Sequence, residues 1–211
     1  SWAFSNHDAP RAASRWSTPP NRAALSQVAT LLLMSLRGNI FLYQGEELGL
    51  PQAQIGFEDL RDPEAIANWP ETLGRDGART PMPWQASAVN AGFSTAAPWL
   101  PVSPEHFALA VDRQQLDPGS QLALTRRLIG LRRRSAVLSR GSLRFIEVAA
   151  DLLVFERSLD GHRLLCAFNL GLSARNWRPS TEREWQIIES VGGAEEWSFP
   201  PLSGLIARCP S

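Results

Sequence analysis

The sequence contains no lysine, so all 21 basic residues are arginine, and 21 acidic residues balance them. Binding to a nucleic-acid backbone normally needs a clear surplus of positive charge, so a neutral chain argues against a nucleic-acid partner. The lack of lysine is typical of a biased codon composition. Since no general physical requirement explains it, it identifies no ligand.

Cysteine is nearly absent: Cys166 and Cys209 are the only two, and their spacing fits no metal-binding motif. We therefore expect two buried free thiols in a reducing, cytoplasmic compartment, with no metal site and no cofactor. The longest apolar run, VATLLLMSL, is shorter than the ~20 residues that span a bilayer, so we expect no membrane partner. Because the chain begins without Met, we expect its true N-terminus to be missing.

Two segments have helical periodicity. Residues 21–37 place apolar side chains at helical spacing before Gly38, a typical left-handed cap; these are Leu25, Val28, Leu32 and Leu36. The run NIFLY at 39–43 follows at once and predicts a buried strand, so helix and strand together favour a parallel α/β sheet.

Residues 51–118 have little periodicity and predict a long loop region with short helices, which is typical of a functional segment. Residues 119–135 predict the second helix, with an apolar face of Leu124, Leu128 and Leu131. We expect its arginines to form a solvated face; they are Arg126, Arg127, Arg132, Arg133 and Arg134.

The pattern changes near Gly141, where short apolar runs of strand length begin. The pair Asp160-Gly161 is a strong signal for a hairpin turn. We therefore predict two domains, 1–140 and 141–211, the second a small antiparallel β domain. Since it contains no cluster of ionisable residues, we expect it to stabilise the first domain, and we expect Arg157 on its exposed face to be replaceable by Ala without kinetic effect.

His7 and Asp8 lie in the stretch FSNHDAPRAASRW. An isolated His-Asp pair is more often a capped turn than a catalytic site. Here the pair follows the apolar run WAF and precedes a loop that leads into a helix. That position fits the C-terminal end of a barrel strand, where (β/α) barrel enzymes hold their catalytic residues.

Three motifs, FSNHDAPR, IFLYQGEELGLP and GRDGARTPMPW, occur in this order across residues 4–84. Together they resemble the C-terminal part of the α-amylase superfamily, glycoside hydrolase family 13, and most of all its α-glucosidase and oligo-1,6-glucosidase branch. The resemblance implies an α/β plus β fold: the C-terminal part of a (β/α)8 TIM barrel, from the end of strand 7 through helix 8, followed by an antiparallel β-sandwich, domain C. Residues 21–37 would be helix 7, 39–43 strand 8 and 119–135 helix 8.

The resemblance also implies chemistry. Family members are retaining glycosidases that use a carboxylate nucleophile and a second carboxyl as acid/base. Asp8 would be a third carboxylate that binds hydroxyls of the reacting glucose and stabilises the transition state, and His7 would donate a hydrogen bond to the same sugar. The nucleophile and acid/base belong to strands 4 and 5, upstream of Ser1. We therefore expect an α-glucoside as substrate, the upstream part of the same barrel as partner, and no activity from this segment alone.

Within GRDGARTPMPW, Arg75 is the first candidate for binding Asp8 and the sugar together, since a guanidinium offers a planar fork of donors. Arg79 is the alternative candidate. For Arg79, a structural role in tying down the loop is favoured equally. Asp76 is interpreted as a loop anchor and Arg11 as a brace after Asp8.

For two further carboxylates and three tryptophans, a structural role is favoured over a functional one. Glu46 and Glu47 end strand 8, and structural hydrogen bonding is favoured for both. Trp69, Trp84 and Trp99 lie in the loop region, where core packing or anchoring is favoured for each over a role in lining a plus subsite.

The function predicted is that of an α-glucosidase hydrolysing α-linked glucose from short oligosaccharides or sucrose-like glucosides. Two alternatives stay open: a transglycosylase or isomerase of the sucrose isomerase or trehalose synthase type, or a non-catalytic relative that acts as a partner subunit.

Overall fold

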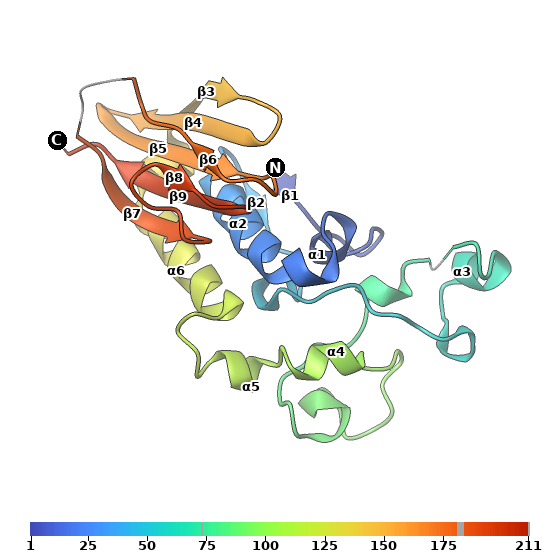
Figure 1. Ribbon diagram of the computed structural model, residues 1–211. Helices are drawn as coiled ribbons and strands as arrows, with labels where there is room; N and C mark the ends of the chain where they lie inside the picture. Colours follow the sequence, from blue (N-terminus) through green and yellow to red (C-terminus); the bar gives the residue numbers. More distant parts are fainter. Residues whose placement is uncertain (73, 181–183, 211) are drawn as a thin grey trace. The chain divides into compact units, whose positions relative to one another are not determined.

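The computed structural model describes residues 1–72, 74–180 and 184–210 (Figure 1). The α-helices are α1 Ala12–Arg15, α2 Arg22–Ser35, α3 Pro63–Ala67, α4 Pro104–Phe107, α5 Val111–Gln114, α6 Gln121–Arg134 and α7 Ala136–Arg140. The 3₁₀ helices are η1 Pro19–Asn21, η2 Glu46–Leu48, η3 Phe57–Asp59, η4 Asp76–Ala78 and η5 Val89–Gly92. The strands are β1 Trp2–Ala3, β2 Ile40–Phe41, β3 Ser142–Val148, β4 Leu152–Leu159, β5 His162–Asn169, β6 Arg175–Asn176, β7 Gln186–Val191, β8 Ser198–Phe199 and β9 Ser203–Arg208.

The chain forms two compact units. The first unit holds Ser1–Trp2, Ala23–Phe41 and Arg126–Ser211, and the second holds Ala3–Arg22 and Leu42–Thr125. No helix in the part of the chain that the structure describes is long and apolar enough to cross a membrane.

A five-stranded sheet of order β3-β4-β5-β9-β7 is the centre of the first unit, and all its neighbouring strands are antiparallel (Figure 1). The β4–β5 hairpin turns at Asp160 and Gly161, whose φ angles are 49° and 84°. Two successive positive φ angles are what a type I′ turn requires. The predicted hairpin and the predicted antiparallel sheet are therefore both confirmed.

One face of this sheet carries an apolar core. Its buried side chains alternate along β4, β5 and β9 and include Phe199 of β8; they are Leu152, Val154, Leu165, Ala167, Ala194, Phe199, Leu205 and Ala207. The short β6–β8 pair thus adds a second layer to this face. Trp177 and Trp197 pack against this core. Their two rings contact each other edge to face, with centroids 6.1 Å apart.

The C-terminal end of α2 is bound by a side chain from α6. Gly38 has a φ of 105°, as its predicted capping role requires. Arg132 donates to the carbonyls of Met34 and Leu36 at 2.8 Å and to that of Gly38 at 2.6 Å. The expectation that Arg132 only solvates a helix face is therefore wrong, because the last carbonyls of α2 need donors. The other four arginines of that run are exposed as predicted.

Arg157 corrects a second expectation. It lies on β4 with an exposed fraction of 0% and not on an exposed face. Its guanidinium donates to the carbonyls of Gly141, Ser142 and Ser35. Burial lowers the pKa of Arg157 to about 10, which still leaves it charged at neutral pH. It therefore joins α7, β3 and the end of α2 through one buried cation.

The strand predicted at 39–43 is shorter and less buried than expected. It spans Ile40–Phe41, pairs with β1, and leaves Phe41 58% exposed. Among the described residues, β1 is the only strand that pairs with it. Cys166 is buried as predicted, whereas Cys209 is only half-buried, and both are free thiols.

The second unit consists mainly of loops and short helices, as predicted for 51–118 (Figure 1). Gln114 holds this loop region together: its amide donates to the carbonyls of Leu48 and Leu109, both at 2.9 Å, and accepts from the Leu122 amide at 3.0 Å. Around it lies an apolar cluster of Leu48, Leu50, Val111 and Leu122. The loop region is thus fixed by polar bonds inside an apolar shell.

We predict that Arg157→Ala lowers the free energy of unfolding by about 3 kcal/mol or more, because three buried carbonyls lose their donor. Arg144→Ala, on the neighbouring strand with a side chain 65% exposed, should change it by less than about 0.5 kcal/mol. Urea denaturation of both variants measures the difference. Equal, small effects would contradict the assigned role of Arg157.

Candidate functional site

The Asn-His-Asp triplet forms a tight turn after β1. The side-chain oxygen of Asn6 accepts from the amides of Asp8 and Ala9, at 2.8 and 3.0 Å. Such Asx turns fix the chain locally, and sequence reasoning had assigned Asn6 no role. His7 and Asp8 leave their side chains 68% and 56% exposed, with His7 Nε2 3.2 Å from Asp8 Oδ2. The turn therefore presents an imidazole and a carboxylate to solvent side by side.

Two arginines of the GRDGARTPMPW motif approach Asp8. Arg79 donates from Nη2 to Asp8 Oδ1 at 3.0 Å and from Nε to the His7 carbonyl at 2.8 Å. Arg75 Nη1 lies 3.6 Å from the same oxygen. The structure thus brings all four predicted site residues together. Arg79 makes the shorter contact, although Arg75 was the first candidate.

Arg75 donates from two of its guanidinium nitrogens to a carboxylate that sequence reasoning missed. Asp62 is 2% exposed and accepts from Arg75 Nε at 2.9 Å and Nη2 at 2.6 Å. This bidentate pair holds the pKa of Asp62 well below its usual range, with the Arg75 side chain as the main cause. The Asp-Pro pair at 62–63 is a sequence signal for a helix start, and Asp62 is indeed the N-cap of α3. No sequence signal links Asp62 to Arg75.

Asp76 anchors the loop, as predicted. Its buried carboxylate accepts from the amides of Arg61 and Asp62, at 2.6 and 2.8 Å. Gly74, at a φ of 55°, lies so close to Asp62 that a Cβ there would be 2.8 Å from its Oδ2. Asp76 therefore positions the backbone of Asp62, and the glycine leaves room for the Asp62–Arg75 pair.

Arg11 braces the segment after Asp8, as predicted, and does so from a buried position. It is 1% exposed and donates to the carbonyls of Gln44 and Ala78, at 2.6 and 3.0 Å. Its own amide donates to the side chain of Gln52 at 2.9 Å. Burial lowers the pKa of Arg11. One guanidinium thus connects the Asp8 segment with two distant stretches of the second unit.

Glu46 and Glu47 have local structural roles, as favoured from the sequence. Glu46 accepts from the amide of Tyr43 at 2.8 Å, and Glu47 accepts from the amide of Gly45 at 2.7 Å. Burial raises the pKa of Glu46. Neither carboxylate is needed to explain the Asp8 site.

The three tryptophans of the loop region are not core residues. Trp69, Trp84 and Trp99 are 39%, 48% and 63% exposed. Trp69 contacts Phe57, with ring centroids 5.8 Å apart. The favoured role in core packing therefore does not hold for Trp84 and Trp99.

The site can bind a neutral polar ligand through one exposed carboxylate, one imidazole and two guanidinium groups. A retaining glycosidase needs two carboxyl groups about 5 Å apart, whereas Asp62 and Asp76 are buried and occupied by other donors. No group of three or more His, Cys, Asp or Glu residues in the described chain could hold a metal ion.

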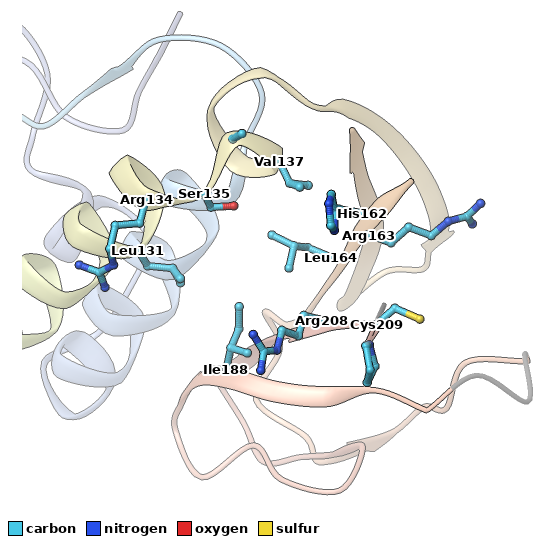
Figure 2. A pocket seen from close by; sticks show the side chains of 12 residues that line it. Leu131, Arg134, Ser135, Val137, His162, Arg163, Leu164, Ile188, Arg208 and Cys209 are labelled. Atoms are coloured by element: carbon cyan, nitrogen blue, oxygen red, sulfur yellow. The ribbon is translucent and has the colours of Figure 1, made fainter. Parts of the chain in front are cut away.

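A cavity of about 630 Å³ in the first unit is a poorer candidate. Figure 2 shows Leu164 directed into it from β5, with Leu131 and Ile188 nearby and the Arg163 guanidinium extending away. Its lining contains no Asp or Glu. It therefore lacks the carboxylate chemistry that Asp8 provides.

We predict that Asp62→Asn lowers the free energy of unfolding by about 2 kcal/mol at pH 7, because the buried charged acceptor is lost. The pKa of Asp62 is lower in the folded chain, so its stabilisation is complete above about pH 4 and declines as the pH falls further. The difference between wild type and Asp62→Asn should shrink below pH 4. Urea denaturation from pH 7 to pH 2.5 measures it, with the exposed Glu71→Gln as control; a constant difference would contradict an ionised Asp62.

The chain is similar to a known family and to curated proteins. The family described as alpha amylase, catalytic domain, matches residues 1–141. A probable alpha-glucosidase of Rhizobium meliloti (strain 1021) is 45% identical over 170 residues, which cover 80% of this chain and 31% of that protein. An oligo-1,6-glucosidase of Heyndrickxia coagulans is 33% identical, covering 88% of this chain and 37% of that protein.

Solved structures give the same result. An alpha-glucosyl transfer enzyme, XgtA, superposes with a TM-score of 0.90 at 39% identity, covering 99% of this chain and 40% of that one. The trehalulose synthase MutB from Pseudomonas mesoacidophila superposes with a TM-score of 0.87 at 28% identity, covering 98% and 42%. The chain thus spans less than half the length of each of these proteins. It belongs to the alpha-amylase family, and residues 1–141 match the catalytic domain of that family.

Proposed function

We propose that this chain is the C-terminal segment of a retaining α-glucosidase that removes α-linked glucose from short oligosaccharides or sucrose-like glucosides. The observation that carries the proposal is the exposed Asp8 carboxylate, held by Arg79 at 3.0 Å and flanked by His7 at 3.2 Å. A carboxylate fixed in this way can accept hydrogen bonds from two neighbouring sugar hydroxyls. The curated relatives with glucosidase names support the choice of substrate class.

Asp8 would act by binding the reacting ring more tightly as it develops oxocarbenium character. Arg79 fixes its position, so little reorganisation is needed at the moment of reaction. His7 would donate to a hydroxyl of the same ring. In this proposal, Asp8, His7 and Arg79 contact the sugar, and Arg75 supports Asp8 from behind while Asp62 holds it in place.

The nucleophile and the acid/base would come from the upstream part of the same barrel. The carboxylates near Asp8 in this chain serve other donors, so none is free to attack the anomeric carbon. We therefore propose that the isolated segment is inactive. The partial coverage of the relatives is consistent with a segment.

In the barrel that we propose, β1 is the end of strand 7, α2 is helix 7, β2 is strand 8 and α6 is helix 8. The domain boundary would lie at residues 140–141, between α7, which ends at Arg140, and β3, which begins at Ser142. Residues 141–211 would then be domain C. The first compact unit spans this boundary, since it joins Ala23–Phe41 to Arg126–Ser211, as expected if barrel helices pack on domain C.

A second candidate function is glucosyl transfer or sucrose isomerisation. It is favoured by the named activities of two similar structures, the glucosyl transfer enzyme and the trehalulose synthase. The same Asp8 site would serve both reactions, and exclusion of water would decide whether a sugar or water attacks. A non-catalytic role is less favoured, because the arrangement of His7, Asp8 and Arg79 is complete.

We predict that Asp8→Asn in the full-length protein lowers kcat/KM by about 100-fold or more, which corresponds to about 3 kcal/mol of lost transition-state stabilisation. The assay follows release of nitrophenol from p-nitrophenyl α-glucoside. Because Asp8 is exposed, the variant should unfold at the same temperature as wild type. Near-normal turnover in a folded variant would refute the assignment.

A second comparison separates the two arginines. Arg79→Lys should lower kcat/KM by about 10-fold or more, because an ammonium cannot bind the His7 carbonyl and Asp8 together. Arg75→Lys should lower the unfolding temperature and should change kcat/KM less than Arg79→Lys does, since Arg75 binds chiefly Asp62. Kinetics and thermal unfolding of both variants test this. The opposite ranking in kcat/KM would assign the sugar contact to Arg75.

A further inference from the structure

A second pocket, distinct from the Asp8 site, lies in the loop region of the second unit. It has a volume of about 320 Å³ and is lined by Asp59, Arg61, Asn90, Pro98, Trp99, Pro101, Val102 and Phe107. Small-molecule sites range from about 300 to 1,000 Å³. The pocket is therefore of a size for one sugar unit and too small for a large cofactor.

Trp99 is presented to solvent by a rigid segment. It is 63% exposed, while the next residue, Leu100, is 1% exposed and anchors the chain. Pro98 and Pro101 restrict the backbone on either side. In the described chain Trp99 has no aromatic neighbour of the kind that Trp69 has in Phe57. The exposed indole face is therefore available to contact a ligand in the pocket.

The polar side of the pocket is held in position as well. The backbone amide of Arg61 donates to Asp76 at 2.6 Å, and Arg61 Nη1 donates to the carbonyl of Leu60 at 3.0 Å. Asn90 donates its amide to the carbonyls of Ser94 and Ala96, at 3.0 and 2.9 Å, which leaves its side-chain oxygen to accept. Asp59 adds a carboxylate. The pocket lining thus combines hydrogen-bond donors and acceptors with an indole.

These groups fit a pyranose better than an ion or a peptide. The Asp59 and Arg61 charges cancel, so the pocket has no attraction for a net anion or cation. An indole face matches the apolar face of a sugar ring, and carboxylate, guanidinium and amide groups match its hydroxyls. Arg61 also adjoins Asp62, whose pair with Arg75 leads to Asp8.

We propose that this pocket binds a glucosyl unit of an α-linked oligosaccharide, with Trp99 stacked on the ring. The proposal rests on the proposed function only for the choice of α-glucosidic probe. It assigns the pocket a binding role that does not require the catalytic carboxylates.

The test is titration of the 211-residue chain with isomaltotriose and with maltotriose, followed by tryptophan fluorescence and calorimetry. We expect at least one of the two to bind saturably with Kd near 1 mM, which is typical of a small weak site. Trp99→Ala should weaken binding 10-fold or more. Trp99→Phe, which keeps an aromatic face, should weaken it less than 3-fold.

Trp84→Ala is the matched control, since Trp84 is an exposed tryptophan of the same loop region outside the pocket. It should change Kd less than 2-fold, and sorbitol, which has hydroxyls but no ring, should not compete. The titration follows binding and not hydrolysis, so a chain without a role in hydrolysis would still bind through Trp99. Absence of saturable binding of both sugars, equal loss in Trp84→Ala, or unchanged binding in Trp99→Ala would overturn the proposal.

Discussion

The Asp8 segment is held in place by one buried guanidinium. Arg11 lies three residues after Asp8 and donates to the carbonyls of Gln44 and Ala78, which come from stretches far apart in sequence. A Cβ at position 45 would lie 2.5 Å from Arg11 Nη1, so glycine at this position leaves room for the Arg11 side chain. A buried charge is costly unless it is fully hydrogen-bonded. The two hydrogen bonds from Nη1 and Nη2 thus link the Asp8 segment to the stretches around Gln44 and Ala78.

Three carboxylates of the second unit differ in their burial and in their hydrogen-bond partners. Asp76 is buried and binds backbone amides, Asp62 is buried and binds the Arg75 side chain, and Asp8 is exposed and shares Arg79 and His7. Burial and their bonds to backbone amides and to Arg75 make the first two structural. Only Asp8 keeps acceptor capacity for a ligand. The site is thus a single exposed carboxylate on a rigid support, which suits differential binding of a transition state.

Local pattern predicted much of the fold. The periodicity of 21–37 and 119–135 and the Asp160-Gly161 turn were sufficient to place α2, α6 and the β4–β5 hairpin. The resemblance brought His7, Asp8, Arg75 and Arg79 into one site. What local pattern could not provide were long-range partners: Arg132 and Arg157 look like surface arginines until their carbonyl acceptors are known. Asp62 reads as a helix cap, and its ion pair with Arg75 exists only in three dimensions.

The central claim is that this chain contributes a sugar-binding carboxylate to a catalytic site whose nucleophile and acid/base lie upstream. The most direct measurement is an assay of p-nitrophenyl α-glucoside hydrolysis by the 211-residue chain, by the separately expressed upstream segment, and by a mixture of the two. We expect no activity from either segment alone and activity that appears on mixing and disappears when the chain carries Asp8→Asn. Hydrolysis by the 211-residue chain alone would contradict the account.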